Sequence, residues 1–252
     1  VVVDWEDDTS VRMSAAQLYE LVFEGNNKWM LSANGTIFTY EYEAIIPGLL
    51  KRWYEERQEM QRKMRECGDN EIEREYWDKR QLVKKINLNS LYGAILNPGC
   101  RFFDIRIGQS VTLTGRCITK HMASKVNEIV TGEYDHKGES IVYGDTDSVY
   151  FSAYKTLQKE IKDGLIPWTK DSVVGLYDKI SEEVNSSFKS FMTKAFHTPT
   201  TRGEVIAAGR ELVASKGLFI TKKRYAVLYY DKEGKRTDVE GKEGKMKAMG
   251  LD

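Results

Sequence analysis

The sequence is poor in the residues that build disulfide frameworks and zinc sites. In 252 residues it has three cysteines and three histidines, and no two cysteines stand in a C-x-x-C spacing. Odd, widely separated cysteines indicate reduced thiols in a cytosolic setting rather than a disulfide framework or a zinc site. We interpret the histidines as structural or solvated. These six residues are Cys67, Cys100, Cys117, His121, His136 and His197.

Net charge, long apolar runs and a signal-peptide pattern are also lacking. Thirty-eight basic residues balance 38 acidic ones, so any polyanion site must come from local clustering. No apolar run approaches the length of a membrane span, and we expect no membrane partner. The remaining composition is ordinary for a globular protein of one or two domains. Because the chain starts without Met, we expect it to be a piece of something longer.

Two long charged helices dominate the first half of the chain. After a short helix over 15–23 and a short strand over 37–42, helical spacing extends over 45–64 and 71–96. The Gly-Asp-Asn turn between the two long helices predicts an antiparallel helical hairpin. Its charges are typical of a solvated surface pair. Basic residues nevertheless gather at the end nearest the rest of the chain: Lys51, Arg52, Arg57, Arg80, Lys84 and Lys85.

The second half predicts two helices, over 108–130 and 172–196, each with an apolar stripe at helical spacing. Short strands are expected over 204–208, 218–230 and 235–239. Helices and strands alternate irregularly and hairpins are evident. The pattern therefore favours an α+β fold with an antiparallel sheet over a doubly wound parallel one.

The stretch 140–153, SIVYGDTDSVYFSA, predicts a β-hairpin whose tip displays two carboxylates. Residues two apart in a strand share a face, so Asp145 and Asp147 can approach one cation. Mg²⁺ binds through one or two carboxylates plus substrate phosphates. The alternative is a solvated turn, because Asp and Gly are common turn residues.

Read together, several strings resemble motifs of family B DNA polymerases, and most of all those of replicative polymerases from T-even-type phages. YGDTDS at 143–148 is similar to the palm motif C, and KINLNSLYG at 85–93 to the fingers motif B, K-x-x-x-N-S-x-Y-G. FTYEYEAIIP precedes the first long helix, and SKG at 215–217 precedes KKRY at 222–225. The strings occur in the family's order, from about residue 35 to the end.

The resemblance implies a palm with an antiparallel sheet and flanking helices, plus a fingers domain made of the two-helix hairpin. The expected domains are 1–42 (N-terminal part of the palm), 43–96 (fingers) and 97–252 (palm). The implied function is DNA-directed DNA polymerase activity in DNA replication, a nucleotidyl transfer from dNTP to a primer 3′-hydroxyl. Two Mg²⁺ ions about 4 Å apart would hold the attacking and leaving oxygens. The implied location is cytoplasmic, in the host cell if the chain is phage-encoded.

By resemblance, Asp147 is the firm metal ligand and Asp145 a supporting carboxylate. Arg57 and Lys85 would grip the dNTP phosphates, Arg as a fork and Lys as a point charge. Asn89 lies one turn beyond Lys85, and Tyr92, on the same face, would pack beneath the nascent base pair.

For DNA binding the resemblance implicates Lys216, Lys222, Lys223, Arg224 and Tyr225. On a continuous strand Lys222 and Lys223 would face opposite ways, and Lys223 would touch the primer near its 3′ end. Such phosphate contacts position the duplex without reading its sequence. Glu204 corresponds only loosely to a family carboxylate near the metal site.

Three departures from the family pattern stand out. Motif A, D-x-x-S-L-Y-P-S, which carries the second essential Asp, is absent, and the string at 4–7, DWED, does not match it. Gln61 stands where the family has a basic residue one turn after Arg57. The exonuclease and thumb parts are also absent. We therefore expect the chain to be inactive alone, whether it is one part of a naturally split polymerase or a truncated one.

The expected partners are primer–template DNA, dNTP, the remaining polymerase domains and a sliding clamp bound through an absent C-terminal segment. The main alternative is a non-catalytic DNA-binding or polymerase-accessory module. A D-x-D glycosyltransferase would need a βαβ domain before the motif, where a helical hairpin is predicted instead. Reverse transcriptases typically place two adjacent Asp in their hairpin and have no K-x-x-x-N-S-x-Y-G helix.

Overall fold

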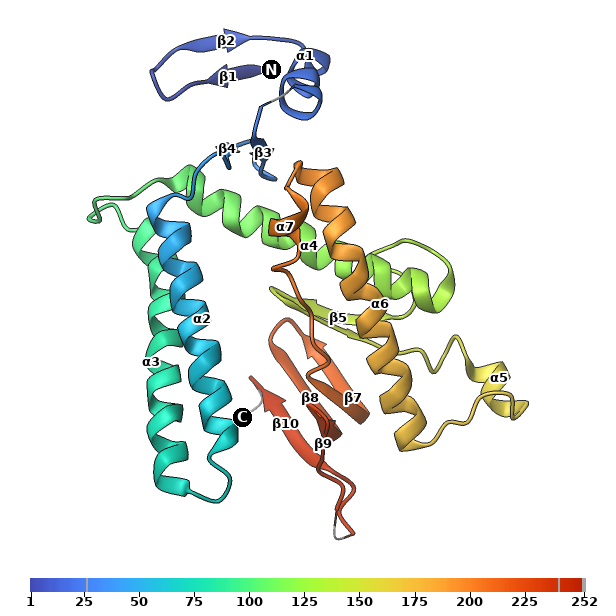
Figure 1. The fold of residues 1–252 in the computed structure, drawn as a ribbon. Coiled ribbons are helices and arrows are strands. Elements are labelled where there is room, and N and C mark those ends of the chain that lie inside the picture. The colour runs from blue at the N-terminus through green and yellow to red at the C-terminus, as the bar shows by residue number, and fades with distance from the viewer. Residues whose placement is uncertain (26, 240, 251–252) are drawn as a thin grey trace. The chain divides into compact units, whose positions relative to one another are not determined.

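A computed structural model describes residues 1–25, 27–239 and 241–250. The chain forms two compact units, Val1–Leu113 and Thr114–Asp252. Helices and antiparallel strands alternate irregularly, which confirms the α+β prediction (Figure 1). Within the described ranges, no helix is both long enough and apolar enough for a membrane span. The three domain ranges expected from the sequence remain a prediction.

Short elements begin the first unit. They are β1 (Val2–Asp4) paired with β2 (Ser10–Arg12), helix α1 (Ala15–Tyr19), the π-helical turn η1 (Glu20–Glu24), and β3 (Trp29–Leu31) paired with β4 (Ile37–Thr39). A capping box starts α1: Ser14 Oγ accepts the Gln17 N–H at 3.1 Å, and Gln17 Oε1 accepts the Ser14 N–H at 2.8 Å. These two bonds satisfy two amides that the first helical turn leaves open.

The predicted helical hairpin is confirmed as α2 (Ile45–Glu66) and α3 (Glu71–Ile95), which run side by side in opposite directions (Figure 1). Asn70 caps α3, because its Oδ1 accepts the Glu73 N–H at 3.2 Å. Glu71 and Glu73 place negative charge at the positive end of that helix. Local sequence therefore sets where the second helix begins.

The core of the second unit lies between α4 (Ile105–Thr131), which begins in the first unit, and α6 (Lys170–Phe196). Val126 of α4 is buried against Ile180, Val184 and Phe188 of α6. The α6 residues recur every four positions, which is the spacing of one helix face. Both helices were predicted from such stripes, and the structure lengthens each by a few residues.

The larger sheet has the order β10 (Lys245–Met249), β8 (Arg224–Lys232), β7 (Leu212–Thr221), all antiparallel, and β9 (Lys235–Arg236) adds to β8. A separate hairpin joins β5 (Ile141–Asp145) to β6 (Ser148–Phe151). Two short helices complete the unit, α5 (Gln158–Lys162) and α7 (Thr200–Gly203).

Two predicted strands are wrong. The expected strand over 218–230 is two strands, β7 and β8, which turn at Lys222–Lys223. Residues 204–208, which were expected to form a strand, do not join a sheet. The backbone of Ala208 bonds instead to α6 side chains: its N–H to Asn185 Oδ1 at 2.7 Å, and its carbonyl to Asn185 Nδ2 at 2.6 Å. Hydrogen bonds to side chains therefore take the place of the hydrogen bonds between strands that a sheet would provide.

Asn127 of α4 anchors the start of β5. Its Oδ1 accepts the Ser140 N–H at 3.1 Å and the Ser140 hydroxyl at 2.8 Å, and its Nδ2 donates to the Glu133 carbonyl at 2.8 Å. Asn127 and Ser140 are each 1% exposed. Gly138 permits this contact, because a Cβ there would lie 2.0 Å from Asn127 Nδ2. The hairpin is therefore fixed to the helix by a buried amide whose oxygen and nitrogen are both hydrogen-bonded.

We predict that Asn127→Ala lowers the free energy of unfolding by about 2–4 kcal/mol, because the N–H and hydroxyl of buried Ser140 and the carbonyl of Glu133 lose their partner. Urea unfolding followed by circular dichroism measures the loss. Asn97→Ala is the control, since Asn97 is exposed and its Oδ1 accepts one N–H, that of Gly99. The control should lose less than about 1 kcal/mol. Equal losses in the two variants would contradict the anchoring role.

His121 of α4 is buried in a polar contact with α6. Its Nδ1 lies 2.7 Å from the Tyr134 hydroxyl and its Nε2 lies 2.9 Å from Ser187 Oγ. The imidazole stacks on Phe191 at a centroid distance of 4.0 Å. Burial, and then the charge of Lys125, lower the pKa of His121. The expectation that this histidine is structural agrees with these contacts.

We predict that His121 makes stability fall in acid. Its folded-state pKa lies below the unfolded value of about 6.5, so the unfolded chain binds the proton more readily. The contribution is complete above about pH 6.5 and decreases as pH drops below it. Urea titrations between pH 7.5 and 5 should show a shallower pH dependence for His121→Gln than for the wild type. The same slope in both proteins would exclude this source.

Candidate functional site

The candidate site is built on the tip of the β5–β6 hairpin, as the sequence predicts. Asp145 pairs with Ser148, which leaves Thr146 and Asp147 as a two-residue turn. The Asp147 N–H donates to the Asp145 carbonyl at 2.7 Å. Thr146 has φ +53°, a region that β-branched residues rarely enter. Asp147 is exposed at the turn and Asp145 is half-buried at the end of β5.

Neighbouring groups hold this unfavourable turn. Thr119 Oγ1, on α4, donates to the Thr146 carbonyl at 2.7 Å, and Ser148 Oγ donates to the Asp145 carbonyl at 3.2 Å. A strained backbone persists where surrounding contacts determine it. Sequence reasoning missed Thr119, because a threonine inside a helix 27 residues before its partner carries no local signal.

The acids at this tip fit a hard cation held jointly with phosphate oxygens. In the part of the chain that the structure describes, no three or more His, Cys, Asp or Glu side chains gather as a metal cage would require. Two carboxylates are the donor set through which Mg²⁺ binds when a substrate supplies the other oxygens. Glu204, which corresponds loosely to a family carboxylate, is ion-paired with Lys189 of α6.

Four aromatic rings pack together behind the tip: Tyr143, Tyr150, Phe219 and Tyr225. We call them the aromatic cluster; their centroid distances range from 5.2 to 6.1 Å. Tyr150 donates to the Tyr225 hydroxyl at 3.3 Å. Burial, and then this hydrogen bond, raise the pKa of Tyr150. Since two rings belong to the β5–β6 hairpin and two to β7–β8, the cluster joins the hairpins.

The basic motif lies at the turn between β7 and β8. Lys222, Lys223 and Arg224 are exposed, whereas Tyr225 is 5% exposed within the aromatic cluster. The Lys223 N–H donates to the Tyr143 hydroxyl at 2.8 Å. Because Lys222 and Lys223 form a turn, the strand alternation expected for them is wrong. Lys216 lies on β7, with its ammonium 3.5 Å from Glu243.

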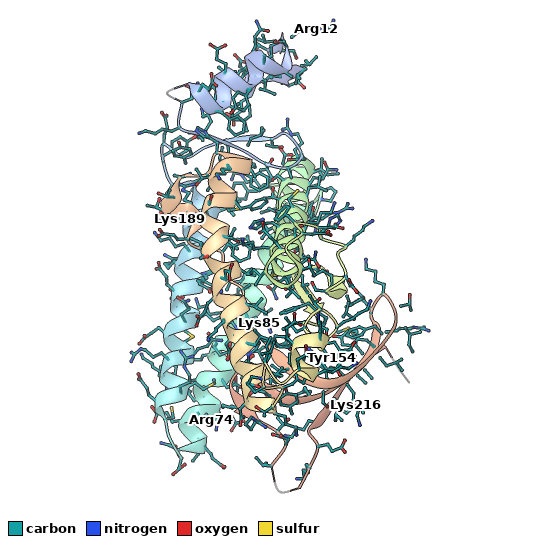
Figure 2. The ribbon with its side chains drawn as sticks, turned by 90° about the vertical axis from the view of Figure 1, so that its right-hand side faces the viewer. Arg12, Arg74, Lys85, Tyr154, Lys189 and Lys216 are labelled. Atoms are coloured by element: carbon teal, nitrogen blue, oxygen red, sulfur yellow. The ribbon has the colours of Figure 1, made fainter. Side chains whose placement is uncertain are left out.

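The residues predicted to bind nucleotide lie on the helical hairpin of the first unit. Lys85 and Asn89 are exposed on α3, on which Arg74 and Lys85 are labelled in Figure 2. Tyr92 is half-buried and donates to the Gly108 carbonyl at 3.4 Å. The neighbouring Lys84 is ion-paired with Glu56, so it is committed to the contact between the two helices.

Arg57 is oriented by a residue that sequence reasoning missed. Its Nε donates to Gln81 Oε1 at 3.2 Å, and Gln81 Nε2 donates to Asp78 Oδ1 at 2.9 Å. Because the amide nitrogen of Gln81 is bonded to Asp78, the amide oxygen is the end that faces Arg57. Gln81 precedes Lys85 by one turn, and this i, i+4 spacing is the signal that could have identified it.

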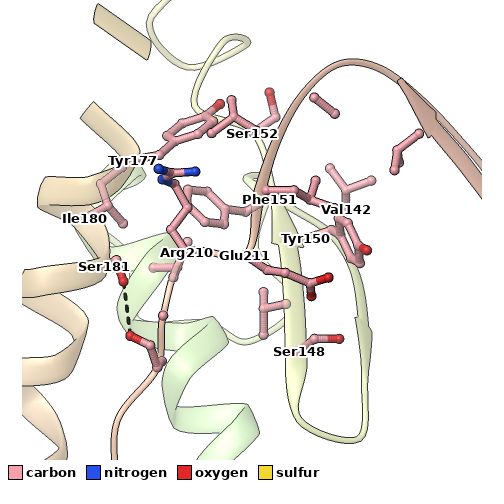
Figure 3. A pocket seen from close by; sticks show the side chains of 18 of the residues that line it. Val142, Ser148, Tyr150, Phe151, Ser152, Tyr177, Ile180, Ser181, Arg210 and Glu211 are labelled. Carbon is pink, nitrogen blue, oxygen red and sulfur yellow. Dashed lines mark hydrogen bonds between the residues drawn. The ribbon is translucent and has the colours of Figure 1, made fainter. Parts of the chain in front are cut away.

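A cavity of about 550 Å³ borders the site within the second unit (Figure 3). All of β6 lines one part of it together with Asp147, and 207–217 line another. Ser181 Oγ donates to the Ala208 carbonyl at 3.2 Å, the dashed line in Figure 3. In the described chain, β6 has a hydrogen-bonded strand partner on one edge, β5.

Comparisons with known proteins identify the family. A model described as DNA polymerase family B matches residues 6–252. The DNA-directed DNA polymerase of Escherichia phage RB69 is 33% identical over 184 residues, covering 68% of this chain and 20% of that protein. Its counterpart in Enterobacteria phage T4 is 30% identical over 184 residues, with coverage of 68% and 20%. DNA polymerase 1 of Pyrococcus abyssi (strain GE5 / Orsay) is 28% identical over 201 residues, covering 80% and 21%.

A solved structure agrees at the level of the fold. The family B DNA polymerase from the archaeon Pyrobaculum calidifontis aligns with a TM-score of 0.52 at 20% identity, covering 90% of this chain and 23% of that one. The chain spans about a fifth of the length of the curated relatives it matches. With a family match over nearly its whole length, the chain belongs to family B of the DNA polymerases.

Proposed function

We propose that this chain supplies the metal-binding hairpin, the primer-binding turn and the nucleotide-binding helices of a DNA-directed DNA polymerase. The enzyme would transfer a nucleotide from dNTP to a primer 3′-hydroxyl by a two-metal mechanism. The observation that carries the proposal is that a hydrogen bond joins two hairpins of the second unit, the β5–β6 hairpin and the β7–β8 hairpin. One tip presents Asp145 and Asp147, and the other presents exposed cations tied to it through Tyr143.

Asp147 would be the principal metal ligand and Asp145 its supporting carboxylate. When bound, Mg²⁺ supplies neutralisation of phosphate charge and activation of the primer hydroxyl. The chain itself would hold the two carboxylates in fixed positions, because Thr119 is hydrogen-bonded to the turn and Asn127 to the start of β5. Rigid placement is what phosphoryl transfer demands most of a protein.

Lys222, Lys223 and Arg224 would contact the backbone of primer–template DNA, with Lys216 further along β7. Exposed cations on a turn reach phosphates without reading bases. Tyr225, buried in the aromatic cluster, would support this turn from beneath. Arg57, Lys85 and Asn89 would bind the triphosphate, and Tyr92 would lie beneath the nascent base pair.

A further segment would complete the metal site. The sequence contains no D-x-x-S-L-Y-P-S string, so one essential carboxylate is absent from these residues. Among the described residues β6 pairs with β5 alone, and its other edge lies beside the 550 Å³ cavity. This arrangement supports addition of a strand there, since a two-stranded sheet alone is marginal. We therefore propose that the 252 residues are inactive alone, and that the remaining domains and a clamp are further partners.

The first prediction of this proposal concerns Asp147 in a polymerase assembled from this chain and a segment that carries motif A. Asp147→Asn keeps the size of the side chain and removes its charge. Primer extension with Mg²⁺ and dNTPs should fall by at least about 10³-fold, because a ligand to the reacting centre is lost. Primer–template affinity, measured by fluorescence anisotropy, should change little.

Asp135→Asn is the matched control, because Asp135 is exposed in the loop between α4 and β5. It should extend primers like the wild type. Primer extension by the 252-residue chain alone would contradict the proposed need for motif A. Full activity of Asp147→Asn would favour an accessory role for this chain.

The second prediction concerns Gln81. In Gln81→Leu, Arg57 loses the acceptor that orients its guanidinium, worth about 1 kcal/mol for one hydrogen bond. The KM for dNTP should rise about fivefold at saturating primer–template, while kcat changes less. Steady-state extension with varied dNTP measures both constants.

Gln58→Leu provides the control for Gln81, because Gln58 is an exposed glutamine on α2. Its KM should match that of the wild type. If Gln81→Leu also keeps the wild-type KM, Arg57 does not depend on this amide for binding triphosphate.

A further inference from the structure

The turn Lys222–Lys223 has a backbone that the hairpin alone does not favour. Lys223 has φ +62°, whereas the φ of Lys222 is not positive. The two-residue turns that match strand twist have positive φ at the first position or at both. Positive φ at the second position favours Gly or Asn, not Lys. The turn therefore needs support from outside β7 and β8.

Tyr143 provides that support. Its hydroxyl accepts the Lys223 N–H at 2.8 Å, across 80 residues of sequence. This amide points out of the hairpin ladder, which pairs Thr221 with Arg224. The hydrogen bond from this amide to Tyr143 therefore stabilises the observed conformation of the turn.

The ring of Tyr143 is itself held on several sides. It stacks on Phe219 at 5.5 Å with 29° between planes, and lies 5.6 Å from Tyr225 and 6.1 Å from Tyr150. Packed rings restrict where the hydroxyl can be. Tyr143 also stands two residues before Asp145 in β5, a distance of about 7 Å along a strand. One short strand thus connects the hydroxyl to the acidic tip.

We infer that Tyr143 is a positioning residue whose hydroxyl sets the primer-binding turn at a fixed place relative to Asp145 and Asp147. The inference rests on the proposed function of the two tips. The ligand it concerns is the primer strand, whose phosphates meet the Lys222–Lys223 turn while its 3′-hydroxyl meets the acidic tip. A shift of about 1 Å between the two tips would misplace the reacting oxygen.

Tyr143→Phe tests this inference, because it removes the hydroxyl and keeps the ring. Tyr150→Phe is the matched control: it removes another hydroxyl of the aromatic cluster, one that bonds to Tyr225 and not to the turn. In the 252-residue chain, amide hydrogen exchange at Lys223 should become about five- to tenfold faster in Tyr143→Phe. In Tyr150→Phe it should stay at the wild-type rate.

In the assembled polymerase, Tyr143→Phe should raise the KM for primer–template and lower the single-turnover rate, each by about fivefold. The KM for dNTP should not change. A general loss of structure would instead alter all three constants and the exchange of many amides. Wild-type exchange at Lys223, or wild-type primer KM and rate, would overturn the inference.

Lys223→Ala separates this inference from the proposed function. If Lys223→Ala weakens primer binding while Tyr143→Phe behaves as the wild type, the turn binds the primer but Tyr143 does not position it. If the assembled wild-type polymerase extends no primer, the proposed function fails and the positioning role fails with it. Faster exchange at Lys223 would then still identify the hydroxyl as the support of the turn.

Discussion

The second unit depends on how one short hairpin is held against a helix. The buried amide of Asn127 fixes the start of β5, and Thr119, two turns earlier on the same helix, fixes the carbonyl of Thr146 at its tip. A two-stranded hairpin has little stability of its own, so these bonds and the core between α4 and α6 determine where it lies. Asp145 and Asp147 take their positions from that attachment.

The same principle organises the basic residues. Lys223 is placed by a tyrosine hydroxyl, and Arg57 by a glutamine whose own orientation an aspartate fixes. In both cases a neutral side chain accepts one hydrogen bond, from the guanidinium Nε of Arg57 and from the backbone N–H of Lys223. A neutral acceptor orients a basic residue without neutralising its charge, which suits the polyanion binding proposed for these residues.

Helices were the most predictable part of the fold. The stripe that contains Ile180, Val184 and Phe188 required only periodicity, and the hairpin of α2 and α3 required only helical spacing and the Gly-Asp-Asn turn between the two helices. Prediction failed where long-range contacts replaced local preference. Lys222–Lys223 read as strand because nothing nearby marks a turn, and its conformation depends on Tyr143. The segment over 204–208 read as strand because the side chain that binds its backbone, Asn185, lies on another element.

The sequence by itself determined the family and the chemical types at the site, because D-T-D, K-x-x-x-N-S-x-Y-G and K-K-R-Y are local strings in a fixed order. Tertiary structure alone decided which neutral residues place them. Thr119 and Gln81 belong to no motif, and the string YGDTDS contains Tyr143 without indicating what its hydroxyl binds. Each of the three acts through a hydrogen bond to a residue distant in sequence. Such a partner is set by how the chain folds, and no local pattern encodes it.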